Sequence, residues 1–401
     1  MNEDQPSLTA GGPSIIVFDC DPYGHHFEFL DHFVEYAGRH PGIQLTVVSH
    51  ELYEPVRLTA NVTIRKLAAD AVRAVTSLPI ERRSIAEMRL LFGALDPNNR
   101  GTLVLLGGDH LMLGVIWYQN RLRTFESVTA LQMAPYPQQD RYSPTDATSH
   151  RLKSIVRRQR KRWMLRFIFA LPKFRLGILN DPDSVREVRR SRMFAGETVF
   201  VPDPVIPYVR GGHGIGTERS TDRSSRHLLI AGTINERKSV SLILGWLARL
   251  NSEGSMGETL VLHILGRCTD DELSTRLLEL KSDQPDAIVV KLDFVEHREL
   301  LETIEKVDIV LALYQNFYSS SGILGHAAEA GTPVLGYANT LIGDLITTYN
   351  LGAVVDHSVG YDSFKTAVRR VLQTKASIHS RRADYVTERR PSNFVESLCG
   401  L

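Results

Sequence analysis

The strongest constraint on this chain is an alternation of short apolar runs with helical patterns, which occurs in two series. The first series occupies residues 14–19, 43–49, 62–67, 102–107, 128–133, 176–180 and 198–203, and the second occupies 227–232, 260–266, 287–292, 307–313, 332–337 and 352–356. Near-continuous apolar strands separated by helices are typical of parallel sheets covered on both faces. The sequence therefore predicts an α/β fold with two doubly wound parallel sheets.

The two series are separated by residues 210–226, which are rich in Gly, Ser, Thr and Arg and typical of a linker. We expect an N-terminal Rossmann-like domain over 1–204, a linker over 205–226 and a C-terminal Rossmann-like domain over 227–375. A helix over 376–401 is expected to cross back onto the first domain. A length of 401 residues with 43% hydrophobic residues supports two cores.

Composition excludes several classes of protein. Lys and Arg number 47 against 46 Asp and Glu, so net charge does not favour nucleic acid, and we expect no nucleic-acid partner. Cys20, Cys268 and Cys399 lie far apart without a CxxC spacing, which argues for reduced thiols in the cytoplasm and against a cysteine zinc site. The acidic, polar first residues and the lack of a run of about 18 apolar residues argue against secretion and against a membrane span.

One segment stands apart in charge. Residues 151–175 contain ten basic and no acidic residues, interleaved with Trp163, Phe167 and other apolar residues, whereas the rest of the chain has 37 basic against 46 acidic residues. A cationic segment with aromatic residues can lie in the headgroup layer of an anionic membrane, which would place the protein at the inner face of the cytoplasmic membrane. A surface helix packed on its own domain is an equally good interpretation.

Polar residues follow the first apolar run, where a doubly wound sheet binds its ligands. Gly24 permits a tight turn and close backbone approach, and His25 and His26 follow it at the start of a helix. Neighbouring histidines point to different sides of a helix, so a shared metal is not expected. Asp19 and Asp21 form an Asp-x-Asp pair, which is a weak metal signal because such pairs are common by chance.

The run at 102–107 is followed by Gly108, Asp109 and His110. A histidine at a strand end can accept or position a hydroxyl proton, so His110 is a candidate catalytic residue together with His25. The alternative is a helix-capping Asp109 beside a His110 that only packs.

The second series offers a candidate anion site in two parts. Arg237 and Lys238 precede an amphipathic helix, and two cations beside a helix N-terminus suit a diphosphate. Ser319 to Gly322 follow the run at 307–313, where backbone amides at Ser321, Gly322 and Ile323 and the hydroxyls of Ser320 and Ser321 would point at an anion. A solvated Arg-Lys pair and an ordinary serine cap are the alternatives.

Residues 228–356 resemble the nucleotide-binding half of GT-B glycosyltransferases, particularly retaining family 4. The resemblance rests on "AGTINERKSVSLIL", "LHILG", "LDFVEHRELLETIEKVDIVLAL", "SSSGILGHAAEAGTPVLGY" and "LIGDLITTYNLGAVVD", in the family's order and near its spacing. The first 200 residues match the family only in their alternation of strands and helices and in the glycine turn at Gly24. The resemblance implies a GT-B fold in which two Rossmann-like domains face a central cleft.

In that family an Arg and a Lys hold the donor diphosphate. Lys238 falls on the Lys position, whereas Thr233 occupies the Arg position and Arg237 is the neighbouring substitute. The family also carries two glutamates eight residues apart, at positions that here hold Tyr318 and His326.

Both family glutamates are therefore absent. His326 could bond a ribose hydroxyl, or it could be a packed helix histidine. Glu329 lies three residues further along the same helix face, from which it could reach the ribose.

The resemblance implies an enzyme that moves a sugar from a nucleotide diphosphate sugar to an acceptor with retention, without a metal or other cofactor. The donor would bind through Arg237, Lys238, the 320–323 stretch, His326 and Glu329, and the acceptor would face Gly24, His25 and His110. Two alternatives stay open: a nucleotide-sugar-binding protein that has lost catalysis, and a nucleotide-sugar epimerase using Asp19, Asp21 and Asp109. The acceptor could be a glycan, a lipid-linked sugar or a small molecule.

Overall fold

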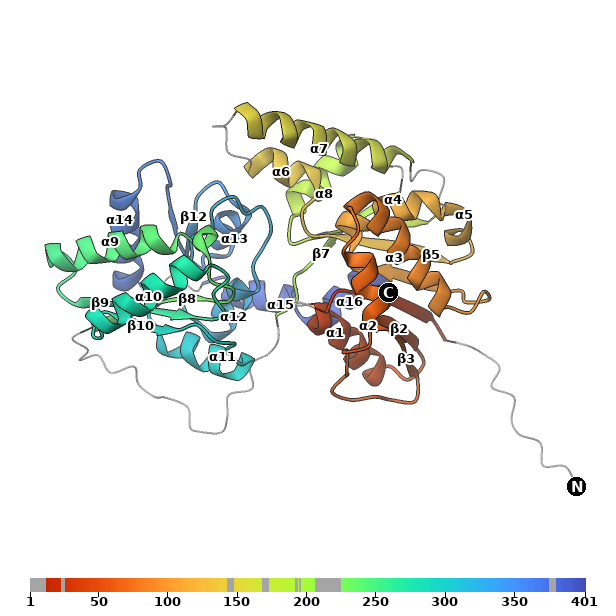
Figure 1. Ribbon diagram of the computed structural model, residues 1–401, viewed down its shortest axis with the longest axis horizontal. Helices are drawn as coiled ribbons and strands as arrows, with labels where there is room; N and C mark the ends of the chain where they lie inside the picture. Colours follow the sequence, from red (N-terminus) through yellow and green to blue (C-terminus); the bar gives the residue numbers. More distant parts are fainter. Residues whose placement is uncertain are drawn as a thin grey trace, which may run out of the picture. The chain divides into compact units, whose positions relative to one another are not determined.

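A computed structural model describes residues 12–22, 26–142, 148–167, 173–191, 194, 196–205, 225–374 and 380–401. They form two compact units (Figure 1). Unit 1 lies within Met1–Asp140, Thr145–Pro202 and Pro391–Leu401, and unit 2 within Arg141–Pro144 and Asp203–Arg390. Most of the expected linker falls outside the described residues, and so do Gly24 and His25.

Unit 1 is built on a parallel sheet of seven strands in the order β3-β2-β1-β4-β5-β6-β7. The strands are β1 (Ser14–Asp19), β2 (Gln44–His50), β3 (Val62–Leu67), β4 (Thr102–Leu105), β5 (Ser127–Gln132), β6 (Phe174–Leu179) and β7 (Glu197–Val201). The helices are α1 (His26–Arg39), α2 (Ala69–Thr76), α3 (Ile80–Ala94), α4 (Gly108–Trp117), α5 (Gln119–Leu122), α6 (Tyr136–Tyr142), α7 (Thr148–Phe167), α8 (Pro182–Ser191) and α16 (Pro391–Cys399). The last residues of α6, Arg141 and Tyr142, belong to unit 2.

Unit 2 contains a parallel sheet of six strands in the order β10-β9-β8-β11-β12-β13. The strands are β8 (Ser225–Ala231), β9 (Thr259–Leu265), β10 (Ile288–Lys291), β11 (Ile309–Ala312), β12 (Val334–Tyr337) and β13 (Gly352–Val355). The helices are the 3-10 turn η2 (Glu236–Lys238), α9 (Val240–Glu253), α10 (Asp271–Asp283), α11 (His297–Lys306), α12 (Gly322–Ala330), α13 (Leu341–Tyr349), α14 (Tyr361–Gln373) and α15 (Arg382–Glu388).

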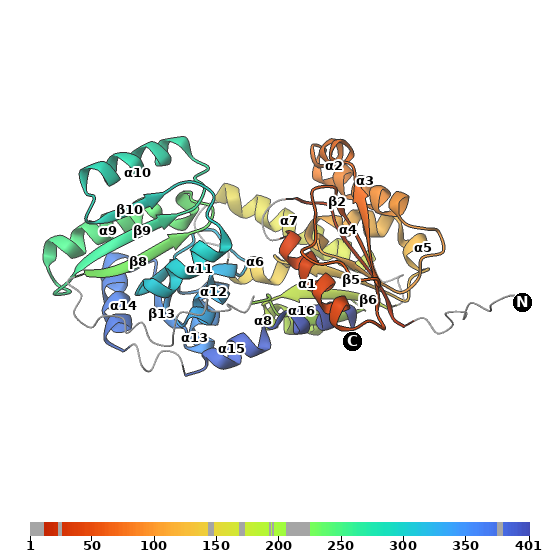
Figure 2. The same cartoon turned by 90° about the horizontal axis from the view of Figure 1, so that it is seen from below.

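Both faces of each sheet are covered by helices, as Figure 2 shows. Successive side chains of a strand point to opposite faces. In β1, Ile16 and Phe18 join one buried cluster, and Ile15 and Val17 join the other. This arrangement explains the near-continuous apolar runs, each of which became a strand, and it confirms the prediction of two doubly wound parallel sheets.

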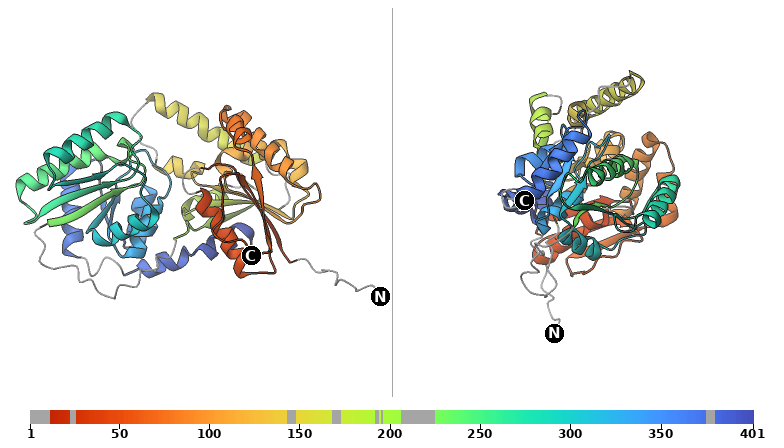
Figure 3. Two further views of the ribbon diagram at one scale, coloured as in Figure 1. Left: turned by 60° about the horizontal axis from the view of Figure 1, so that its bottom comes forward. Right: turned by 90° about the vertical axis from the view of Figure 1, so that its left-hand side faces the viewer.

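The C-terminal segment differs from the single helix expected over 376–401. It contains α15, which belongs to unit 2, and α16, which belongs to unit 1. Pro391 is the first residue of α16, and a proline disfavours helical conformation in the residue before it, so the two helices are separate. Helix α16 lies beside α1 (Figure 3), where the rings of Phe394 and Phe29 are 4.9 Å apart.

Candidate functional sites at the two sheet edges

Each sheet has a topological switch point, where the strand order reverses. In unit 1 the switch lies between β1 and β4, and in unit 2 it lies between β8 and β11. Ligands of open α/β sheets bind beyond the carboxyl ends of the strands at such points. In unit 1 Asp19 is the last residue of β1 and His110 follows β4, and in unit 2 Lys238 follows β8 and Ser321 follows β11.

The loop after β8 is held close to the end of β9 by hydrogen bonds from Gly232 N to the carbonyl of Leu265 (3.0 Å) and from Ile234 N to that of Arg267 (2.9 Å). Gly266 has φ +130°, and a Cβ built there would lie 2.1 Å from the carbonyl oxygen of Gly232. Only glycine fits this approach. The loop that carries Arg237 and Lys238 is therefore anchored to the end of β9.

Lys238 is nearly buried, with 5% of its surface exposed. Its ammonium donates to the carbonyl of Ala231 and lies 5.1 Å from the ring centroid of Tyr314. Among the described residues, no carboxylate lies within 4.0 Å of it. A buried charge without a counter-ion is costly, because desolvation is not offset by a partner. An anionic ligand would supply that partner.

Arg237 is exposed, and its guanidinium carbon lies 4.7 Å from the ring centroid of Phe317 and 6.0 Å from that of Tyr314. Its carbonyl accepts a 2.7 Å hydrogen bond from Gln315 N, which ties the loop after β8 to the loop after β11. Gln315 Nε2 also donates to Ser239 Oγ at 3.1 Å. These bonds fix the two cations beside the aromatic side chains of the second loop.

Helix α12 begins at Gly322, and no side chain caps its N-terminus at Ser321. Helix-start amides without a cap are available to a ligand. A Cβ added at Gly322 would meet nothing within 4 Å, so the space beside this helix start is open. Ile323 is 8% exposed and belongs to the second buried cluster of unit 2.

The serines before α12 do not share one role. Ser320 donates its hydroxyl to Asp203 Oδ2 at 2.9 Å and is 8% exposed, so in this structure it supports the loop instead of presenting a hydroxyl to an anion. Ser321 Oγ donates to Tyr314 OH at 3.4 Å. Burial raises the pKa of Asp203 to about 6, against the lowering effect of the Ser320 hydrogen bond.

His326 is half-buried in α12, and its ring lies 4.8 Å from that of His297 at the start of α11. Burial, and then the charge of His297, lower the pKa of His326 to about 4, so it is neutral at pH 7. Glu329 is half-buried one turn further along the helix, and Tyr318 is half-buried in the loop before it. The neutral His326 ring can bond a hydroxyl but cannot supply the negative charge of a glutamate.

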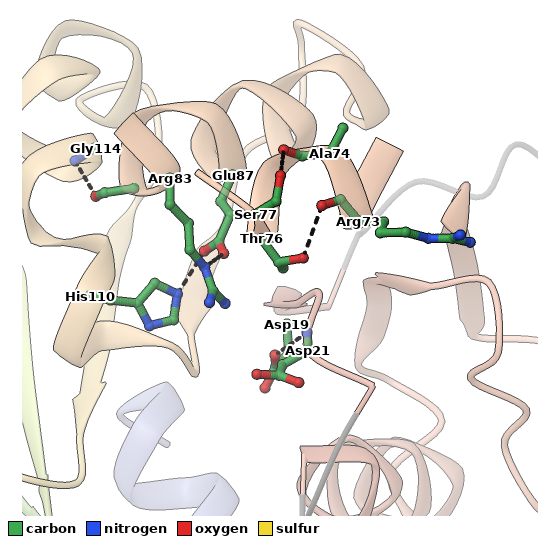
Figure 4. A network of polar contacts seen from close by, with 11 residues as sticks. Asp19, Asp21, Arg73, Ala74, Thr76, Ser77, Arg83, Glu87, His110 and Gly114 are labelled. Atoms are coloured by element: carbon green, nitrogen blue, oxygen red, sulfur yellow. Dashed lines mark hydrogen bonds and ion pairs between the residues drawn. The ribbon is translucent and has the colours of Figure 1, made fainter. Parts of the chain in front are cut away.

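In unit 1 the switch point holds two carboxylate–histidine pairs. His110 Nε2 lies 2.7 Å from Glu87 Oε2, and Arg83 Nε donates to Glu87 Oε1 at 2.5 Å (Figure 4). His26 Nδ1 lies 2.5 Å from Asp19 Oδ2. Both carboxylates are nearly buried, with 1% of Glu87 and 4% of Asp19 exposed.

The charges of the pairs shift two pKa values in opposite directions. Burial acts to raise the pKa of Glu87, but the bonds and charges of His110 and Arg83 outweigh it and lower that pKa below its usual value. Burial acts to lower the pKa of His26, but the hydrogen bond and charge of Asp19 outweigh it and raise that pKa. Glu87 is therefore an ionised carboxylate at neutral pH.

Asp109 has a structural role in this unit, because its Oδ2 accepts hydrogen bonds from the amides of Met133 (2.7 Å) and Ala134 (3.1 Å) after β5. Glu87 and Arg83 were not predicted from the sequence. The sequence feature that could have identified Glu87 is its place on one face of α3. It shares this buried face with Ser84, Met88 and Leu91. A charge on such a face implies a partner.

The described residues contain no group of three or more His, Cys, Asp and Glu side chains arranged to hold a metal ion. Nor does any helix within those residues have the length and apolar character needed to cross a membrane.

No protein-family model matches the chain, and no curated protein matches it in sequence. Several solved structures, by contrast, are similar to the chain in three dimensions. WaaG, a glycosyltransferase involved in lipopolysaccharide biosynthesis, has a TM-score of 0.64 at 14% identity, covering 97% of this chain and 100% of its own. A UDP-forming trehalose-phosphate synthase from Burkholderia xenovorans, in complex with glucose-6-phosphate, has a TM-score of 0.65 at 11% identity, covering 96% and 98%. A trehalose-6-phosphate structure from E. coli bound with UDP-2-fluoro glucose has a TM-score of 0.64 at 10% identity, covering 97% and 99%.

At these identities the likeness concerns the fold. The chain has two parallel-sheet α/β units with the GT-B fold of these glycosyltransferases, as the resemblance implied.

Proposed function

We propose that the protein is a glycosyltransferase that moves a sugar from a nucleotide diphosphate sugar to an acceptor hydroxyl. The observation that carries the proposal is the pair of cations at the switch point of unit 2. Lys238 is buried without a carboxylate partner among the described residues, and Arg237 lies on the rings of Phe317 and Tyr314. Beside them, α12 begins without a side-chain cap. This combination suits a diphosphate.

In the reaction the acceptor oxygen forms a bond to the anomeric carbon, while the bond between that carbon and the phosphate oxygen breaks and its electron pair leaves with the diphosphate. The acceptor proton passes to the departing diphosphate. Lys238, Arg237 and the amides from Ser321 to Ile323 would stabilise that charge as it develops. Fixed cations and amides do this without a metal or other cofactor. His326 and Glu329 would face the ribose of the donor, and unit 1 would bind the acceptor, with His110, His25 and the turn at Gly24 as its site.

The fold relatives support a nucleotide-sugar donor, since one was solved with UDP-2-fluoro glucose and another is described as UDP-forming. Retention of configuration follows from the family 4 resemblance. Tyr318 and His326, where that family has glutamates, favour a second candidate function, a nucleotide-sugar-binding protein without turnover.

Calorimetric titration with UDP, ADP and GDP, followed by release of the nucleotide from matching sugar donors, tests both functions. Binding with turnover supports the transferase, and the anomeric configuration of the product then tests retention. Binding without turnover over a broad set of glycan, lipid-linked and small-molecule acceptors supports the second function. If no nucleotide binds, both are wrong.

We also propose that the basic segment 151–175 binds an anionic membrane surface. Helix α7 has a buried side at Met164 and Leu165, whereas Val156 (61%), Trp163 (59%) and Phe167 (54%) are exposed. Their spacing of seven and four residues places them on one helix face. The rings of Trp163 and Phe167 lie 5.3 Å apart.

The positive charge of the basic segment favours an anionic partner for this helix face. The segment has ten basic and no acidic residues, and within it Arg166 and Lys173 are exposed. Arg160, on the same helix face, pairs with Glu81 at 2.5 Å. An apolar stripe with basic neighbours suits the headgroup layer of an anionic bilayer. The cytoplasmic side of the membrane is part of this proposal, and the free cysteines Cys20, Cys268 and Cys399 support it.

A further inference from the structure

Strand β13 is an edge of the unit 2 sheet without charged side chains. Its sequence is GAVV, and among the described residues only β12 pairs with it. Charged side chains at a sheet edge discourage pairing with another strand. The other edge strands of the two sheets carry such charges, with Lys66 on β3, Glu197 on β7 and Lys291 on β10. Of these edges, β13 therefore has the least protection against a further strand.

The backbone of β13 offers hydrogen-bonding groups on its outer side. The carbonyl of Val355 accepts a 2.9 Å hydrogen bond from Ala338 N, so the backbone groups of Val355 face β12. Backbone groups of successive residues in a strand face opposite sides of it. Gly352 and Val354 therefore direct their N–H and C=O groups away from β12, to a side where no described strand pairs with them.

A groove follows this edge beside α14. One wall is formed by Ala353 and Val354 and the other by one side of α14, and the groove has a volume of about 280 Å³. Helix α14 packs against β13 (Figure 2). Val359 also lines the groove, with 56% of its surface exposed. The middle of the helix contributes Thr366 and Ala367, whose small side chains leave room for another strand at the edge.

The side of α14 along the groove carries opposite charges at its two ends. Asp362, Thr366 and Arg370 are exposed and follow one another at a spacing of four residues, so they lie on one helix face. Within the described part of the chain, neither Asp362 nor Arg370 forms an ion pair. A second α14 that runs antiparallel about Thr366 would bring its arginine to Asp362 and its aspartate to Arg370. The charge pattern of this helix face is therefore self-complementary.

We infer that β13 and α14 form the interface of a homodimer, in which the β13 strands of two copies pair antiparallel and join the two unit 2 sheets. A two-fold axis through Ala353 places Gly352 opposite Val354 of the partner subunit, so that the outward N–H and C=O groups of both copies bond to each other. The inference concerns unit 2 alone and does not depend on the proposed glycosyl transfer.

The same axis sets the two α14 helices antiparallel on one face of the joined sheets. Asp362 of each copy then lies opposite Arg370 of the partner subunit, and the pattern is satisfied twice. An extended peptide would also find bonding groups along β13. A second copy is the better partner, because the identical helix supplies the matching charges in the matching order.

Exchange of the two charges tests the interface in the full-length protein. We expect sedimentation velocity to show the wild type passing from monomer to dimer across the micromolar range. Arg370→Asp and Asp362→Arg each place like charges opposite one another at two points of the dimer, so the dissociation constant should rise at least about tenfold in each. The double variant restores opposite charges, and its dissociation constant should return to within about threefold of the wild type.

A control and a backbone variant accompany the charge exchange. Arg57→Asp changes an exposed arginine of unit 1 and should leave the dissociation constant unchanged. Val354→Pro removes an outward amide, at an edge where proline is tolerated, and should make the protein monomeric. Val354→Ala keeps that amide and should keep the dimer. Circular dichroism and the melting temperature show whether each variant is folded.

The outcomes are distinct. Loss of the dimer in both single charge variants and its return in the double variant support the interface. A wild type that stays monomeric throughout the range overturns it, and β13 would then be open only to an extended peptide. A dimer that survives in folded Val354→Pro, or that neither single charge variant weakens, has another interface and also overturns the proposal.

Discussion

The imidazole rings of His297 and His326 lie 4.8 Å apart in an edge-to-face arrangement, and neither His297 Nε2 nor His326 Nδ1 has a hydrogen-bond partner within the described residues. Both atoms are buried. A protonated ring here would place a charge in a poorly solvated site next to a second histidine. This relationship has a consequence for the pH dependence of stability.

We expect unit 2 to lose stability as pH falls from about 6.5 to about 4. Burial and then His297 lower the folded-state pKa of His326 to about 4, so in this window the unfolded chain binds a proton that the folded chain does not. His326→Gln should flatten the dependence by an amount on the order of 1 to 3 kcal/mol. Urea unfolding followed by Trp246 fluorescence, in a Trp117→Phe and Trp163→Phe background, measures it.

His357→Gln is the matched control for His326, because His357 is an exposed histidine of the same unit. An equal pH dependence in wild type and His326→Gln would contradict the burial argument. His263, whose pKa burial also lowers to about 4, keeps its own contribution in both proteins.

Lys238→Ala should weaken binding of a nucleoside diphosphate at least tenfold, which corresponds to about 1.4 kcal/mol. The ammonium is the buried cation of the unit 2 site, and alanine removes both its charge and its donors. Calorimetric titration with the nucleotide that binds the wild type measures the change. Lys365→Ala is the control, because Lys365 pairs with Glu253 at the far end of α9. Unchanged affinity in Lys238→Ala would remove its phosphate role.

Gly266→Ala should destabilise unit 2 by about 1 to 3 kcal/mol, because a left-handed φ and a clash with Gly232 O coincide at one residue. The displaced loop should also weaken nucleotide binding. Gly245→Ala, inside α9 with no atom within 4 Å of the new Cβ, is expected to stabilise by roughly 0.5 to 1 kcal/mol. Urea unfolding curves of the two variants should shift in opposite directions, and a parallel shift would contradict the prediction.

Trp163→Ala combined with Phe167→Ala should reduce co-sedimentation with vesicles of phosphatidylglycerol and phosphatidylcholine several-fold, because the exposed aromatic stripe of α7 is lost. Trp117→Ala is the matched control, since Trp117 is 70% exposed on α4 outside the basic segment. Binding should fall with added salt and with vesicles of phosphatidylcholine alone. Wild-type protein that does not sediment with anionic vesicles would contradict the membrane proposal.

Parts of the candidate sites followed from local sequence patterns. Arg237, Lys238 and His110 were singled out because each follows an apolar run, and parallel strands bring their carboxyl ends to one edge. Glu87 and Arg83 could not be located in this way, because they lie on a helix between strands, and Glu87 reaches His110 only when α3 packs on α4. The binding of the Ser320 hydroxyl to Asp203 joins residues 117 positions apart, which no local pattern reports.

The sequence by itself determined the two doubly wound sheets, because a continuous apolar run is a local pattern. A strand with apolar side chains on both faces is stable only in a sheet that helices cover on both sides. The sequence also determined that cations, serines and glycines stand after the strands. Only the tertiary structure decided which of these groups have partners. Among the described residues, Lys238 has no carboxylate partner. His110 lies in hydrogen-bond contact with the buried Glu87, and the Ser320 hydroxyl donates to Asp203. Such pairings depend on contacts between distant segments, and the free energy of a buried charge is set by those contacts.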